Sequence, residues 1–231
     1  VLCWGANTAG QLGNGTTYNA GSMPHPQLTN DASPYLSIAA GTGHACGIRL
    51  NDSRVLCWGN GGLGALGNGG TSNKGVPTLT SDAAGYRQLS LDDYFSCGIR
   101  LNDSRVLCWG SNLNGQLGDG TTTQRNVPTL MNNTFAVMTV VAGYQHTCIV
   151  RMNDSRLLCN GGGVSGELGD GLTTVAQNNS VFVNTTSTFF STALLRASFV
   201  MSLQWLVSGR QKGITGPSAV LPMIMQIMAV G

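Results

Sequence analysis

Apolar and polar positions form short segments along the chain, and glycine-rich stretches separate these segments. In the clearest copy, residues 135–142 are apolar and rich in β-branched residues, which is typical of a buried strand. A second strand is expected from His146 to an Asn-Asp-Ser turn, and a third from Arg156 to Cys159. A Val-Pro-Thr-Leu element precedes them at 127–130, where proline suits a strand start or edge. The first 185 residues show no helical period, so the pattern predicts an all-β protein.

The same unit recurs four times. Cys-Trp-Gly or a remnant of it begins at Cys3, Cys57, Cys108 and Cys159, and a Gly-x-Leu-Gly core follows at Gly10, Gly64, Gly115 and Gly166. Both markers are separated by 54, 51 and 51 residues. A repeat of this length indicates stacked supersecondary units, because one unit cannot bury its apolar face alone. We predict one repeat domain over residues 1–187, which starts within a repeat.

Glycine-rich loops follow each Cys-Trp-Gly marker, and two of them match G-x-G-x-x-G. A dinucleotide site is rejected because no amphipathic helix follows either loop. The third loop position is Asn7, Gly61, Asn112 or Gly163. Asparagine and glycine are the residues that best tolerate a left-handed backbone. We therefore expect a structural role for these loops, with a left-handed residue at this position.

Six of the seven cysteines form pairs of fixed spacing: Cys46 with Cys57, Cys97 with Cys108, and Cys148 with Cys159. Opposed residues in an antiparallel hairpin have a constant index sum. Cys46 and Cys57 sum to 103, as do Leu50 and Ser53, which leaves Asn51 and Asp52 as the central turn residues. Directly opposed cysteines lie near disulfide range. We predict three cross-hairpin disulfides; the alternative is three pairs of reduced, buried cysteines. The spacing is unlike that of zinc ligands.

Seven Asn-x-Ser/Thr sequons are present, at Asn14, Asn51, Asn102, Asn132, Asn153, Asn178 and Asn184. Three of them, Asn51, Asn102 and Asn153, fall at the predicted hairpin tips, where a glycan would meet no neighbour. Together with paired cysteines they favour a secreted or cell-surface glycoprotein. A partner for Cys3 is expected about eleven residues upstream, by the same spacing, so we expect an amino-terminal portion ahead of Val1.

The string Val-Leu-Cys-Trp-Gly-Ser-Asn-Leu-Asn-Gly-Gln-Leu-Gly, followed by Gly-Thr-Thr and Val-Pro, resembles the regulator of chromosome condensation repeat. Residues 41–80 and 94–130 carry the resemblance most clearly, and it extends over residues 1 to 175. It implies a β-propeller of four-stranded blades of about fifty residues, usually about seven in a closed ring. The cysteines depart from the intracellular nucleotide-exchange members and are closer to secreted and ectodomain versions, such as crinkly-type repeats of plant receptor kinases.

Four repeats are fewer than such a ring needs. Three explanations of this small number are open: a truncated chain, a ring completed by another chain, or an open stack of blades. The repeat also ends before the carboxyl terminus: the next cysteines are expected at 199 and 210, where Phe199 and Arg210 stand. Residues 188–231 are a divergent apolar segment. A helical appendage, a lipid-anchor signal and a reading-frame change in the source sequence all remain open for this segment.

Several recurring residues have alternative interpretations. His44 and His146 occupy one repeat position, and because Phe95 occupies it in the other copy, a packed residue is favoured over a catalytic base. The tryptophans of the Cys-Trp-Gly markers pack between blades or form sugar-stacking platforms; they are Trp4, Trp58 and Trp109, with Asn160 in the fourth copy. For Asp119 and Asp170, which asparagine replaces elsewhere, a turn role is favoured over calcium binding.

Charge and composition argue against several classes of function. The formal net charge is +2 and only 10% of residues are charged, which argues against nucleic-acid binding. No nucleophile, phosphate-loop or metalloprotease motif is present, so we expect neither an enzyme nor a bound cofactor or metal. We interpret the chain as an extracellular structural or protein-interaction module, with partners or self-assembly through rim loops or open edges. A carbohydrate-binding module is the alternative, and a guanine-nucleotide exchange factor a weaker one.

Overall fold

The fold is known from a computed structural model that describes residues 1–17, 22–173 and 176–184. Blade A comprises β3 (Tyr35–Ala40), β4 (His44–Arg49), β5 (Val55–Gly59) and β6 (Lys74–Leu79). Blade B comprises β7 (Tyr86–Asp92), β8 (Phe95–Arg100), β9 (Val106–Gly110) and β10 (Arg125–Leu130). Blade C comprises β11 (Val137–Ala142), β12 (His146–Arg151), β13 (Leu157–Gly161) and β14 (Gln177–Phe182). The half-blade comprises β1 (Leu2–Ala6) and β2 (Ser22–Leu28), and a short 3-10 helix, η1 (Gly62–Gly64), follows β5.

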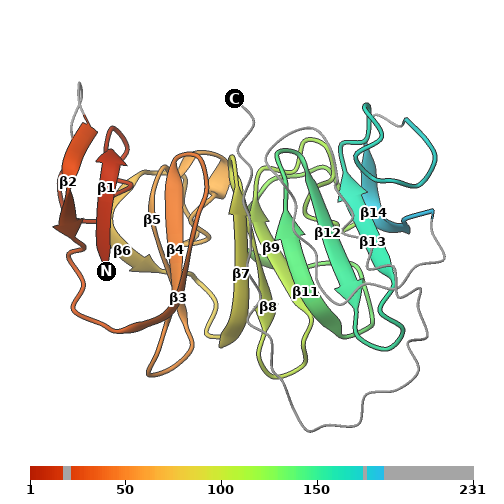
Figure 1. Cartoon of the computed structure of the whole chain (residues 1–231), viewed down its shortest axis with the longest axis horizontal. Coiled ribbons are helices and arrows are strands. Elements are labelled where there is room, and N and C mark those ends of the chain that lie inside the picture. Colours follow the sequence, from red (N-terminus) through yellow and green to blue (C-terminus); the bar gives the residue numbers. More distant parts are fainter. Residues whose placement is uncertain (18–21, 174–175, 185–231) are drawn as a thin grey trace, which may run out of the picture.

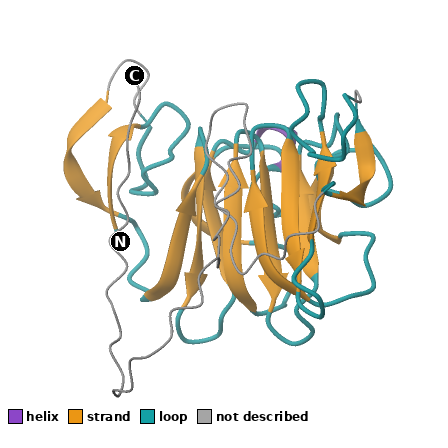
Figure 2. Ribbon diagram, turned by 45° about the vertical axis from the view of Figure 1, so that its right-hand side comes forward, coloured by secondary structure: helices purple, strands orange, loops and turns teal. Residues whose placement is uncertain are grey.

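Each blade is an antiparallel meander in which strands that follow one another in the chain are hydrogen-bonded neighbours. The half-blade and the three blades stand side by side in chain order (Figure 1), and apart from η1 the regular elements of the described chain are strands (Figure 2). This arrangement confirms the all-β class and the four-stranded blades predicted from the sequence. The predicted segment 188–231 lies outside the described residues.

The blades have two distinct ends. The hairpins that join β4 to β5, β8 to β9 and β12 to β13 project from the lower end in Figure 1, which we call the tip end. The long loops after β5, β9 and β13 begin at the opposite, upper end, together with the hairpins that join β7 to β8 and β11 to β12. We call this the loop end.

The register of the central hairpin follows the predicted index sum, since Cys46 pairs with Cys57 and Ile48 with Val55. The turn is longer than a two-residue turn, however. The Arg49 amide donates to the Arg54 carbonyl at 2.8 Å, and the Ser53 amide donates to the Arg49 carbonyl at 2.9 Å. The loop therefore contains four residues, of which Asn51 and Asp52 are the middle two, and Ser53 closes it with a φ of 58°.

The hydrophobic core lies between blades rather than within one. One buried cluster joins Cys46 and Cys57 of blade A to Tyr86 and Trp109 of blade B. Another joins the Cys97 and Cys108 face of blade B to Val137, Val140 and Ile149 of blade C. Because successive side chains of a strand point to opposite faces, cysteine and tryptophan, which are adjacent in each marker, face different neighbours. The disulfide faces the following blade and the indole faces the preceding one.

The glycine-rich loops correct one expectation. Asn7 and Asn112 are not left-handed; they are fully buried and hold their loops together through their side chains. The Asn112 side-chain oxygen accepts a hydrogen bond from the Leu117 amide at 3.0 Å, and its nitrogen donates to the Thr121 carbonyl at 3.1 Å. The recurring asparagine therefore serves as an internal hydrogen-bonding hub for the loop.

We predict that Trp109→Ala lowers the free energy of unfolding by about 3–5 kcal/mol, because it empties a fully buried site between two blades. Trp4→Ala is the matched control, since Trp4 holds the same repeat position but is 64% exposed. That variant should change stability by no more than about 0.5 kcal/mol. Chemical denaturation without reductant measures both, and equal losses would contradict the inter-blade assignment.

Candidate functional site

Three disulfides staple the central hairpins, in the pairing predicted from the spacing. They join Cys46 to Cys57, Cys97 to Cys108, and Cys148 to Cys159, each with a Cα–Cα distance of 4.1 Å. All six cysteines are fully buried. Cys3 is a half-buried free thiol. Each bridge joins directly opposed residues of neighbouring strands, so it fixes the register of the strands that carry the tip-end loops.

An arginine–aspartate pair closes each tip-end loop. In blade A, the Arg49 Nε donates to Asp52 Oδ1 at 3.0 Å, and the same oxygen accepts the Arg54 amide at 3.1 Å. The guanidinium hydrogen bond lowers the pKa of Asp52 to about 2. The same pairs recur as Arg100 with Asp103 and Arg151 with Asp154. This clamp explains the recurring aspartate. The signal for this clamp in the sequence is Arg-x-x-Asp, which recurs at a period of 51 residues and was not among the predicted features.

The sequon asparagines at the tips are available for modification. Asn51, Asn102 and Asn153 are exposed, and within the described ranges their side chains make no hydrogen bond. The turn itself therefore does not require asparagine at this position. The turn does not favour the serine two positions later either. Ser53, Ser104 and Ser155 have left-handed φ values of 58°, 56° and 53°. Glycine or asparagine would suit that backbone better.

The four other sequons differ from one another. Asn178 is half-buried, and its side-chain nitrogen donates to the Gly120 carbonyl at 3.0 Å. This nitrogen is the atom to which a glycan would have to be attached. The Asn14 side-chain oxygen accepts the Thr16 amide at 3.1 Å in a turn. Asn132 is exposed but its side chain donates to Asn179 at 2.9 Å, and Asn184 is exposed. The side chains of Asn178, Asn14 and Asn132 therefore differ from those at the tips, because each makes a hydrogen bond.

The tryptophans dock on the loop of the preceding blade. The Trp58 indole nitrogen donates to the Gln11 carbonyl at 3.0 Å, and the Trp109 nitrogen to the Ala65 carbonyl at 2.9 Å. Both rings are fully buried, so for these two residues the packing interpretation is confirmed and the sugar-stacking interpretation is wrong. Both rings also lie against a glycine: a Cβ at Gly13 would approach Trp58 to 2.8 Å.

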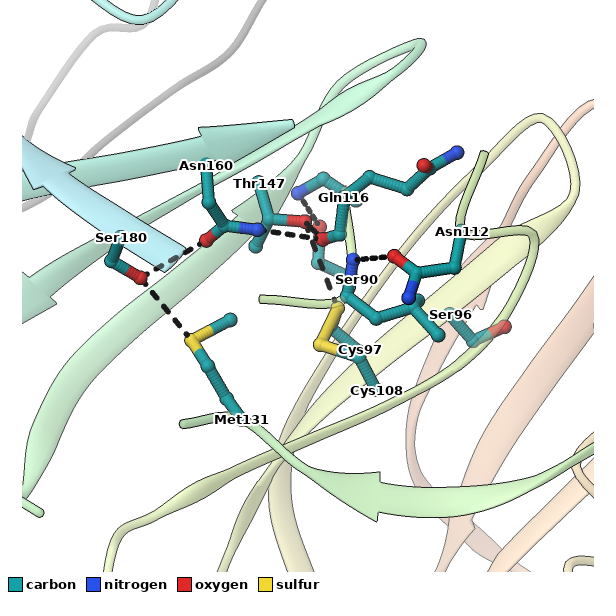
Figure 3. The surroundings of a disulfide bond; sticks show 12 residues. Ser90, Ser96, Cys97, Cys108, Asn112, Gln116, Met131, Thr147, Asn160 and Ser180 are labelled. Atoms are coloured by element: carbon teal, nitrogen blue, oxygen red, sulfur yellow. Dashed lines mark hydrogen bonds between the residues drawn. A yellow bond between two sulfur atoms is a disulfide. The ribbon is translucent and has the colours of Figure 1, made fainter. Parts of the chain in front are cut away.

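Asn160 of blade C makes the equivalent contact with the loop of blade B, and we call this contact between neighbouring blades the junction. Figure 3 shows Asn160 and Thr147 of blade C directed at the Gln116 carbonyl of blade B, beside the Cys97–Cys108 disulfide. The Asn160 side-chain nitrogen donates to this carbonyl at 3.0 Å, and the Thr147 hydroxyl donates to it at 2.7 Å. The loop carbonyl is therefore the constant acceptor of the junction, while the donor residue varies.

The two buried histidines are packing residues. The His44 Nε2 lies 2.8 Å from the Ser96 hydroxyl of the next blade. That hydroxyl donates to the Ala65 carbonyl at 3.1 Å, so the His44 Nε2 carries the proton and Nδ1 is an unpaired acceptor. Burial lowers the pKa of His44 to about 4. Burial also lowers the pKa of His146. A neutral, enclosed imidazole fits the packing role that Phe95 fills at the equivalent position.

The aspartates of the Gly-Asp-Gly loops have turn roles, as predicted. Asp119 accepts the Thr121 amide at 3.0 Å and Asp170 accepts the Leu172 amide at 2.9 Å. Asn68 accepts the Gly70 amide in the same way at 3.1 Å. Within the described residues, no three His, Cys, Asp or Glu side chains gather into a group that could hold a metal ion.

The loop end exposes apolar side chains. The exposed fractions are 73% for Leu113, 61% for Tyr144 and 59% for Val164. Leu63 and Tyr94 add smaller exposed areas in the neighbouring loops. Exposed apolar groups on adjacent loops are typical of a protein-binding surface. The exposed sequons of the tip end lie at the opposite end of the blades.

No helix in the described part of the chain is long and apolar enough to cross a membrane.

Comparison with protein families finds a match to the regulator of chromosome condensation (RCC1) repeat over residues 1–48 and 103–150. The ultraviolet-B receptor UVR8 of Arabidopsis thaliana is 33% identical over 177 residues, which cover 74% of this chain and 39% of the receptor. The human probable E3 ubiquitin-protein ligase HERC4 is 29% identical over 182 residues, which cover 75% of this chain and 17% of the ligase. The chain thus spans well under half the length of either relative.

Solved structures with the same fold include yeast RCC1 (Prp20) bound to Kap60, with a TM-score of 0.67 and 19% identity. That match covers 80% of this chain and 44% of the yeast chain. Human WBSCR16 matches with a TM-score of 0.66 and 20% identity, over 76% of this chain and 45% of the human chain. At this level of identity, the two matches show the fold.

We predict that acid destabilises the fold through His44. Because the pKa of His44 is about 4 in the folded chain and about 6.5 when unfolded, only the unfolded chain takes up its proton between these values. Its contribution is fully present above about pH 6.5 and is lost as pH falls toward 4. From pH 7 to 4.5, this costs about 2.5 kcal/mol of unfolding free energy.

The measurement compares wild type with His44→Phe, the residue type found at Phe95, by chemical denaturation at both pH values. His146 and the carboxylates titrate in both proteins and cancel in the difference. The variant should lose about 2.5 kcal/mol less than wild type. An identical loss in the two proteins would show that His44 is not held neutral.

Proposed function

The chain carries repeats of the regulator of chromosome condensation (RCC1) family, and from this premise we propose that it is an extracellular, glycosylated protein-interaction module. The observation that carries the proposal is the set of three buried disulfides, each between directly opposed residues. Disulfides persist in oxidising compartments and are rare in the cytosol. They support the secreted type of repeat over an intracellular nucleotide-exchange role.

The tip-end tripeptides support glycosylation. Turn chemistry accounts for the aspartate, because Asp52 binds Arg49 and the Arg54 amide. It accounts neither for an exposed asparagine without a hydrogen-bonding partner nor for a serine in a left-handed conformation. Glycan attachment requires both residues, since the acceptor motif is asparagine followed two positions later by a hydroxyl residue. The requirement is met in the same way in all three blades.

The loop end is the binding face in this proposal. Its exposed leucine, valine and tyrosine side chains offer an apolar surface, and the exposed tip sequons lie at the other end of the blades. Glycans at the tips would shield that end and leave the loop end open to a protein partner. A carbohydrate-binding role has less support, because Trp58 and Trp109, the residues that suggested it, are buried.

Secretion from a eukaryotic host should yield glycans at Asn51, Asn102 and Asn153. Each of the variants Asn51→Gln, Asn102→Gln and Asn153→Gln should lose one glycan, seen as one step in mass before enzymatic deglycosylation and no step after it. Asn178→Gln is the matched control and should lose none, because its nitrogen is engaged with Gly120. Unmodified asparagine at all three tips would remove the glycoprotein part of the proposal.

Protein binding should depend on the loop end. The double variant Leu113→Ser/Tyr144→Ser should weaken capture of a partner from the extracellular medium by at least about tenfold, since both side chains are largely exposed. The control Leu50→Ser/Leu101→Ser alters tip-end leucines that are 55% and 53% exposed, and it should bind as wild type does. Equal binding by wild type and both variants would argue against the loop end as the binding face.

A further inference from the structure

The disulfides of blades A and B lie between blades and not at the surface. Cys46 and Cys57 belong to a buried cluster that blade A shares with blade B, and Cys97 and Cys108 to one that blade B shares with blade C. All four cysteines have an exposed fraction of 0%. A reagent that reacts with one of these sulfurs therefore reaches it only when the two blades are apart.

Blade B supplies the side chains that cover the Cys46–Cys57 bridge. They are Tyr86, Leu91, Leu107 and Trp109, which share a buried cluster with the two cysteines. Leu107 is 5% exposed and Trp109 is fully buried. The cover comes later in the chain than the bridge, since Tyr86 follows Cys57 by 29 positions and Trp109 follows it by 52.

Blade C covers the Cys97–Cys108 bridge in the same way. Its Thr147 hydroxyl lies 3.9 Å from the Cys97 Sγ, beside the bridge in Figure 3. The apolar side chains of blade C in this cluster include Val137, Val140, Ile149 and Leu158. Leu158 stands 51 positions after Leu107 and is its equivalent in the repeat. In both cases the following blade closes over a bridge that the preceding part of the chain already contains.

We propose that each of these two bridges forms before the following blade docks, so that a thiol–disulfide oxidoreductase acts on the chain blade by blade from the amino-terminal side. Its substrate is an undocked hairpin. That hairpin can pair locally, because Cys46 and Cys57 are directly opposed and only 11 positions apart. At a synthesis rate of about 5–20 residues per second, the stretch from Cys57 to Trp109 takes about 3–10 s to appear.

The oxidation comprises two thiol–disulfide exchanges. One cysteine thiolate of the hairpin attacks a sulfur of the oxidoreductase disulfide, which breaks that bond, forms a mixed disulfide and releases one oxidoreductase thiolate. The second cysteine thiolate attacks the hairpin sulfur of the mixed disulfide, which forms the Cys46–Cys57 bond and releases the other oxidoreductase thiolate. The hairpin loses two electrons and two protons, and the oxidoreductase gains both.

The mixed disulfide is the step that docking prevents. It links a second protein covalently to Cys46 or Cys57, and both residues are fully buried against blade B in the folded chain. A protein cannot occupy that place while the side chains of blade B fill it. Reduction passes through the same kind of mixed disulfide and therefore requires the same access.

Reduction of the folded, full-length chain by dithiothreitol tests the proposal. Leu158→Ala weakens the contact of blade C with blade B, and Leu107→Ala weakens the contact of blade B with blade A. We expect Leu158→Ala to speed reduction of Cys97–Cys108 at least about tenfold, and Leu107→Ala to speed reduction of Cys46–Cys57 equally, through local opening. In each variant the other bridge should react within about twofold of its wild-type rate.

Timed alkylation of free thiols, followed by peptide mapping, measures the two bridges separately in one sample. Leu50→Ala and Leu101→Ala are the controls, because these tip-end leucines are 55% and 53% exposed; both rates should stay at the wild-type value. Circular dichroism before reduction establishes that each variant is folded. Rates that no substitution changes would overturn the proposal, because the sulfurs would then be reached with the blades in contact. Equal acceleration of both bridges by either variant would overturn the blade-by-blade order.

The inference rests on the disulfides that support the proposed function, but not on glycosylation or partner binding. A native chain without these bridges would remove the basis of both. Intact bridges whose reduction lacks the crossed pattern would overturn this inference alone. Unmodified tip asparagines or unchanged partner binding would count only against the proposed function.

Discussion

The pairing of two directly opposed cysteines in the central hairpin of each blade is the constraint on which the other features depend. It fixes the strand register, and register decides which side chains face each neighbouring blade. With Cys57 directed at the following blade, Trp58 must face the preceding one. The core that results is shared between blades, so a blade buries apolar side chains against its neighbours.

The junction tolerates a change of donor because its acceptor belongs to the backbone. Asn160 replaces tryptophan and still donates to the Gln116 carbonyl at 3.0 Å, while Thr147 supplies a second donor at 2.7 Å. The loop that presents this carbonyl is held in place by its own buried asparagine, Asn112. A repeat of 51 residues can therefore vary at the marker tryptophan while the contact between blades keeps its geometry.

Much of this could be predicted from the sequence, because the informative contacts are local and repeat. The index sum of Cys46 and Cys57 gave the hairpin register, and the four markers gave the repeat and its period. Other features could not be predicted, because they depend on contacts between residues that are far apart in the sequence. The alternation of Cys57 and Trp58 places them on opposite faces but does not say which neighbour each face meets. The surroundings of Asn178 could not be foreseen, because its nitrogen is engaged by Gly120, a residue 58 positions away.

The proposed secretion, glycosylation and partner binding at the loop end all depend on the three disulfides. The most direct test of these disulfides is a non-reducing peptide map of the native protein combined with a count of free thiols. The account predicts that Cys46 is linked to Cys57, Cys97 to Cys108 and Cys148 to Cys159. Seven free thiols, or bridges between cysteines of different blades, would contradict it.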